Sequence, residues 1–130
     1  IRDILVPAIR KRFPDKSLVE GEPPEPIATF PAAHPAVGEL QIMDDGVEAT
    51  VVLGKHTHSH FNPYDETLSS AEVAQRVTDS VLVFLTDLFA DRVLVWSIPG
   101  GGAGGWMLLP ADSSRIPATA SRFVWSGPVS

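Results

Sequence analysis

The sequence predicts an α+β fold, a single domain over residues 1–130 in which an antiparallel sheet of about four to six strands carries a long helix on one face. Three observations predict it. Two segments have apolar residues at helical spacing, a hairpin signal lies between them, and apolar runs of strand length follow the second segment. A chain of 130 residues can bury a sufficient core without disulfides, and this one has no cysteine.

The first predicted element is an amphipathic N-terminal helix over residues 3–13. Its apolar residues recur every three or four positions: Ile4, Leu5, Ala8, Ile9 and Phe13. The basic residues at 10–12 lie largely on the other side of the helix. Their positive charges interact favourably with the negative end of the helix dipole. Pro7 should lie in or near the first turn or kink the helix, and Pro14 helps to end it.

A proline-rich connection over residues 15–35 leads to the clearest local signal, the Asp-Gly pair at 45–46, which favours a two-residue hairpin turn. That turn predicts a register with Asp44 opposite Val47 and Ile42 opposite Ala49. The residues then expected to face the core are Val47, Ala49, Val51 and Leu53. Continuing the same alternation along the chain puts the histidines that follow on the less buried face.

The second helix is predicted from about residue 70 to 90, because Ser69 and Glu72 match a capping box. Its core positions follow at helical spacing: Val73, Val77, Val81, Phe84, Leu85 and Leu88. Residues 92–98 form a nearly continuous apolar strand, and the glycine run at 100–105 favours a flexible connection to a strand from residue 106. A last strand is expected over residues 121–126, with Phe123 and Trp125 on one face.

Three histidines at alternate positions are the main chemical signal: His56, His58 and His60. In an extended segment their side chains would share one face, which suggests a zinc site or a proton-handling surface. Alternate residues lie roughly 6.5 to 7 Å apart along a strand, so two of these histidines and a ligand from elsewhere are the more realistic metal site. The alternative is a polar strand face whose imidazoles bond to water, hydroxyls or backbone.

Other candidate residues lie near this run or in the C-terminal third. Tyr64 and Asp65 fall in a predicted turn, where they could bind a partner or assist proton transfer, or serve only as turn and packing residues. Trp106 follows the glycine run and could line a binding surface, although a tryptophan is more often part of the core. No serine lies in a Gly-x-Ser-x-Gly turn, so the sequence lends no support to serine hydrolase chemistry.

Charge limits the classes of partner. Asp and Glu outnumber Lys and Arg by 16 to 10, a net charge of −6, which argues against nucleic acid, and no apolar run is long enough to cross a membrane. The chain starts at Ile1 without an apolar signal segment, so we expect a processed or trimmed chain and a cytoplasmic location. The leading hypothesis is a small acidic binding module that engages a protein partner or its own copy through residues 56–65. The alternative is a metal-dependent enzyme.

Overall fold

The computed structural model describes residues 1–110 and 112–129, and its strands divide between two antiparallel sheets. The first sheet has the order β1 (Val19–Glu20), β2 (Ala28–Phe30), β3 (Leu40–Asp44), β4 (Ala49–Leu53) and β5 (Thr57–Phe61). The second has the order β7 (Gly104–Leu108), β6 (Val93–Ser97), β8 (Ser121–Val124) and β9 (Gly127–Pro128). A 3-10 turn, η1, spans Ser113–Arg115. The predicted α+β class is confirmed, and the second sheet is a feature the sequence did not predict.

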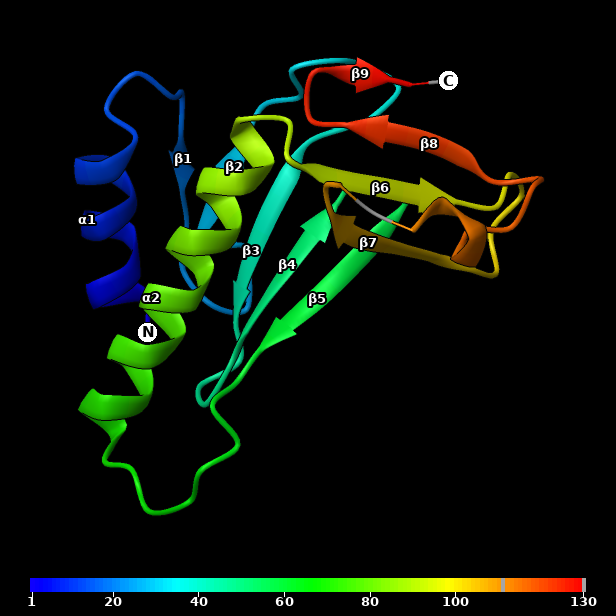
Figure 1. Ribbon diagram of the computed structural model, residues 1–130. Helices are drawn as coiled ribbons and strands as arrows, with labels where there is room; N and C mark the ends of the chain where they lie inside the picture. The colour runs from blue at the N-terminus through cyan, green and yellow to red at the C-terminus, as the bar shows by residue number, and fades with distance from the viewer. Residues whose placement is uncertain (111, 130) are drawn as a thin grey trace.

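The helices α1 (Arg2–Arg12) and α2 (Ser70–Phe89) pack against each other beside the five-stranded sheet (Figure 1). The capping box that the sequence predicts begins α2: the Ser69 hydroxyl accepts from the Glu72 N–H, and the Glu72 carboxylate accepts from the Ser69 N–H. Pro7 lies inside α1, past its first turn. The two helices and the hairpin between them are therefore as expected, whereas β1 and β2 form within residues 15–35, where the sequence predicts only a connection.

The hairpin of β3 and β4 differs from its predicted register by two residues. Asp44 pairs with Ala49 and Ile42 with Val51, so the loop comprises residues 45–48 and not two residues. The physical reason lies in the turn, where the Asp44 carboxylate accepts from the Gly46 N–H at 2.8 Å and favours the longer loop.

The error in register leaves the buried face of this hairpin unchanged, because side chains alternate with a period of two. Ala49, Val51 and Leu53 face the core as predicted, each no more than 2% exposed. Val47 is also predicted to face the core, and for this residue the prediction is wrong. It lies in the loop with 62% of its surface exposed, because the longer loop removes it from the strand.

One core joins both sheets and both helices. Its largest fully buried side chains come from α1, α2 and the five-stranded sheet: Leu5, Ile9, Phe30, Leu40, Ile42, Leu53, Leu85 and Leu88. Val93, Val95, Phe123 and Trp125 bring the second sheet into the same cluster. The second sheet meets the first near β5, which contacts both β6 and β7. No helix within residues 1–110 and 112–129 has the length and apolar character needed to span a membrane.

Candidate functional site

The histidine run divides between a turn and a strand. Gly54 has a φ of 52°, and the chain reverses over residues 54–56 before β5 begins at Thr57. His56 therefore lies in the turn, while His58 and His60 lie on β5, opposite Val52 and Thr50. The expected common face holds for His58 and His60, which are exposed, and is wrong for His56. In the sequence, the glycine three residues before the strand is the feature that indicates this turn.

His56 is held by groups from three other segments. Its Nε2 lies 2.7 Å from the Ala36 carbonyl oxygen and its Nδ1 lies 2.7 Å from the Ser97 hydroxyl. The Phe123 ring packs against the imidazole, with 4.3 Å between the centroids. A carbonyl oxygen can only accept, so Nε2 carries a proton, and in the neutral imidazole Nδ1 accepts from Ser97. Sequence reasoning missed Ser97, because 41 residues separate it from His56.

His56, Ser97 and Phe123 line a groove of about 800 Å³ where the two sheets meet. The groove is lined by the turn before β5, the end of β6, the glycine loop that follows it, and β8. The titratable side chains that line it are Lys55, His56 and His58. Within the described part of the chain no Asp or Glu lines the groove, although the protein as a whole has a net charge of −6.

His60 belongs to a separate network on the outer face of the five-stranded sheet. Its Nδ1 lies 2.7 Å from the Glu48 carboxylate and 3.0 Å from the Thr50 hydroxyl, which in turn donates to Asp45 at 2.7 Å. The carboxylate can only accept, so Nδ1 carries a proton and the neutral ring keeps its lone pair on Nε2. The His58 ring lies beside it, edge to face, with 5.1 Å between centroids.

The geometry of a metal site is incomplete on this face. Among the residues that the structure describes, no group of three His, Asp or Glu side chains is placed to hold one ion. His58 and His60 are neighbours, whereas both nitrogens of His56 are engaged elsewhere. A zinc ion bound by His58 and His60 stays a prediction, and Glu48 is the group that would orient His60 toward it.

Tyr64 and Asp65 belong to the β5–α2 loop, which lies at the bottom of the molecule in Figure 1, below the β3–β4 loop. They line a pocket of about 570 Å³, called here the tip pocket, with Gly46, Val47, Asn62, Pro63, Glu66, Leu68, Ser70 and Val73. Tyr64 is 78% exposed and has a φ of 52°, and its N–H donates to the Asn62 side chain at 2.8 Å. This bond fixes the loop that carries the tyrosine.

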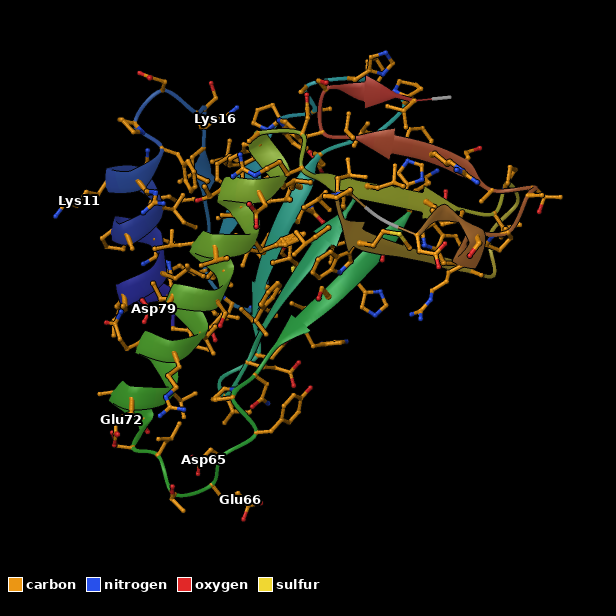
Figure 2. The ribbon with its side chains drawn as sticks, in the orientation of Figure 1. Lys11, Lys16, Asp65, Glu66, Glu72 and Asp79 are labelled. Carbon is orange, nitrogen blue, oxygen red and sulfur yellow. The ribbon has the colours of Figure 1, made fainter. Side chains whose placement is uncertain are left out.

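Carboxylates surround the tip pocket, and Figure 2 shows Asp65, Glu66 and Glu72 at the same end of the molecule. The Thr67 hydroxyl and N–H donate to Asp65 and lower its pKa, and the positive charge of Arg76 lowers it further. The Ser69 N–H and hydroxyl lower the pKa of Glu72 in the same way. Both carboxylates therefore stay ionised well into the acidic range.

Trp106 takes part in packing. Its ring meets Phe84 of α2 edge to face, with 4.8 Å between centroids, and it is partly buried against the core. It lines neither the groove nor the tip pocket. A binding role for Trp106 stays a prediction, and its contacts are those of a residue that fixes the second sheet on α2. Comparison of the chain with models of protein families, with curated proteins and with solved structures finds no match.

Proposed function

We propose that the protein is a binding module whose tip pocket takes a basic, partly apolar segment of a partner protein. The observation that carries this proposal is an exposed apolar surface with ionised carboxylates around it. Val47 and Tyr64 expose 62% and 78% of their surfaces, and both line the same pocket. Exposed apolar surface with a polar rim is typical of protein interaction sites.

Tyr64 is the natural anchor of such an interface. Tyrosine offers a large contact area with few rotatable bonds, and residues of this type recur among those that dominate binding energy. The hydrogen bond from the Tyr64 N–H to Asn62 holds its backbone before a partner arrives. A loop that is ordered in advance loses less conformational entropy on binding, which favours affinity.

The charge around the pocket selects the partner. Asp65, Glu66 and Glu72 lie at this end of the molecule, whereas Lys11 and Lys16 lie toward the other end (Figure 2). Lysine or arginine side chains beside an apolar anchor would meet complementary charge here. The net charge of −6 would also steer a basic partner toward the protein and make association sensitive to salt.

The test is binding of a synthetic peptide that combines arginine with leucine, measured by fluorescence anisotropy at low and physiological salt. We expect Tyr64→Ala to weaken binding about tenfold or more, which corresponds to about 1.4 kcal/mol. Val47→Ala should also weaken it. Val19→Ala is the matched control, since Val19 is 63% exposed on β1, outside the tip pocket. Equal affinities for the wild type and Tyr64→Ala would contradict the proposal.

The oligomeric state is measured on the same samples by size-exclusion chromatography with light scattering. A monomer is the expected result, because the proposed partner is another protein. A dimer that Tyr64→Ala dissociates would assign the tip pocket to a second copy of the chain instead.

A second candidate function, zinc binding on the outer face, is favoured by the bond between Glu48 and His60. A carboxylate on the far nitrogen is the usual orienting group of a zinc-bound histidine, and here it leaves Nε2 free. Titration with Zn²⁺ in a calorimeter should give binding at one site per chain that His58→Gln and His60→Gln each abolish. His34→Gln is the control, because His34 lies outside the run. No heat of binding and no rise in melting temperature with Zn²⁺ would contradict this function.

A further inference from the structure

We propose that Ser97 and His56 form a nucleophile and general-base pair that hydrolyses esters in the groove between the two sheets. This activity goes beyond binding at the tip pocket and depends on different residues. The Ser97 hydroxyl lies 2.7 Å from His56 Nδ1, within the range in which a base can take the proton of an attacking hydroxyl.

The histidine has the orienting partner that such a pair requires. The Ala36 carbonyl accepts from Nε2 at 2.7 Å, which keeps the proton on Nε2 and the lone pair of the neutral ring on Nδ1, toward Ser97. In Ser-His-Asp catalytic triads a carboxylate orients the histidine. Here a backbone carbonyl oxygen occupies that position. The Phe123 ring, 4.3 Å away between centroids, fixes the plane of the imidazole.

The position of Ser97 gives a substrate access to its hydroxyl. Ser97 is the last residue of β6 and follows Val95 on the face that turns toward the core, where the strand leaves the packed interior and enters the groove. Pro99 and the glycines that follow line the same groove. No sequence motif marks Ser97 as a nucleophile, because this serine ends an antiparallel strand, whereas the Gly-x-Ser-x-Gly turn belongs to a strand followed by a helix.

The reaction has two steps. In the first, the Ser97 oxygen attacks the ester carbonyl carbon, its proton passes to His56 Nδ1, and the alcohol leaves with that proton, which leaves an acyl group on Ser97. In the second, His56 takes a proton from water, the resulting hydroxide attacks the acyl carbon, and the proton returns to the Ser97 oxygen as the bond to the acyl group breaks. One ester and one water give one carboxylic acid and one alcohol.

The charge of the groove indicates the class of ester. Its titratable lining consists of Lys55, His56 and His58, and no carboxylate from the described part of the chain lines it. An ester that carries a negative charge in its acyl part would therefore meet a cation and no repelling group. Lys55, which is exposed beside His56, is the residue that would recognise this charge.

The first experiment is labelling of the wild-type protein with a fluorophosphonate, followed by mass spectrometry to locate the modified residue. We expect the label on Ser97, and its loss in Ser97→Ala and in His56→Gln. Ser80→Ala is the control, because Ser80 is an exposed serine of α2 outside the groove. No label, or a label on Ser121 or any other serine, would overturn the proposal. The wild-type result is independent of whether the variants fold.

The second experiment compares the hydrolysis of 4-nitrophenyl acetate and 4-nitrophenyl hydrogen succinate. General-base assistance is worth on the order of 10²-fold or more, so His56→Gln should lose about that factor with both esters. Ser97→Ala removes the nucleophile itself and should lose at least as much, while its melting temperature stays near that of the wild type. The succinate ester should be the better substrate, and Lys55→Gln should remove that preference. Equal rates for the wild type and Ser97→Ala would overturn the activity, and equal rates for the two esters would overturn the substrate class.

Discussion

Gly104, the first residue of β7, lies against the backbone of the turn that carries His56. A Cβ built on Gly104 would collide with the His56 carbonyl oxygen and would also lie 3.1 Å from the Trp96 carbonyl oxygen. Both neighbours are backbone atoms that cannot rotate away. A glycine at this position therefore allows β7 to pass the turn that carries His56, and with it the formation of the groove.

We expect Gly104→Ala to lower the free energy of unfolding by about 2 kcal/mol, because the added methyl group must push the turn and β7 apart. The measurement is chemical denaturation together with the NMR signals of the His56 ring, which should shift. Gly100→Ala is the control: Gly100 has a φ of 90° and no atom within 4 Å of a built Cβ, so it should lose only about 1 kcal/mol and leave those signals in place. An unchanged His56 ring in Gly104→Ala would contradict this explanation.

Among the helices and strands, α2 is the element in which the pattern of apolar residues in the sequence agrees best with the pattern of burial in the structure. Its buried positions recur at three and four residues, and the capping box stops the helix from fraying at Ser69. Neighbouring residues on opposite faces have very different surroundings. Val81 is fully buried in the core, whereas Val83, two residues later, is 64% exposed.

This contrast predicts unequal effects of the same substitution. Val81→Ala should lower the free energy of unfolding by roughly 2 kcal/mol, from lost burial and the small cavity that remains. Val83→Ala should have an effect near zero, since little buried area is lost and alanine favours a helix more than valine does. Urea denaturation of both variants measures the difference. Equal effects would mean that α2 does not pack on the sheet through the Val81 face.

At the scale of the whole molecule, charge is distributed unevenly. The groove at the junction of the sheets has no carboxylate in its lining within the described residues, while carboxylates gather at the tip pocket. Arg10 of α1 is paired with Glu20 of β1 at 2.6 Å, at the exposed edge of the sheet. One acidic domain therefore presents two surfaces of different electrostatic character.

The lowered pKa values at the acidic end predict how stability depends on pH. Asp65 and Glu72 have pKa values below their ordinary values of 3.8 and 4.5 because threonine and serine groups donate to the carboxylates. The stability they contribute is complete above about pH 4.5 and is lost as the pH falls through the lower pKa values of the folded state. Melting temperatures between pH 6 and 2.5 should fall less steeply in Glu72→Gln than in the wild type. Glu66→Gln is the matched control and should keep the wild-type slope.

Sequence patterns predicted the parts of the structure that depend on near neighbours in the chain. The bounds of α2, its capping box and the alternation of β4 follow from the spacing of apolar residues and from one serine with one glutamate. The predicted register of β3 on β4 was wrong because residues 45–48 form a longer loop, in which the Asp45 N–H donates to the Glu48 carbonyl and the Gly46 N–H donates to the Asp44 carboxylate. Propensity rules for the Asp-Gly pair do not include those bonds.

Local sequence patterns were enough to predict the α+β class, the two helices and a run of histidines around position 58. What those histidines contact depends on how distant parts of the chain pack together. His56 meets Ala36, Ser97 and Phe123, which come from distant parts of the chain, whereas His60 meets Glu48 and Thr50 across a hairpin. Alternation along a strand fixes which face a side chain occupies, whereas the packing of one sheet on another determines which residues that face contacts.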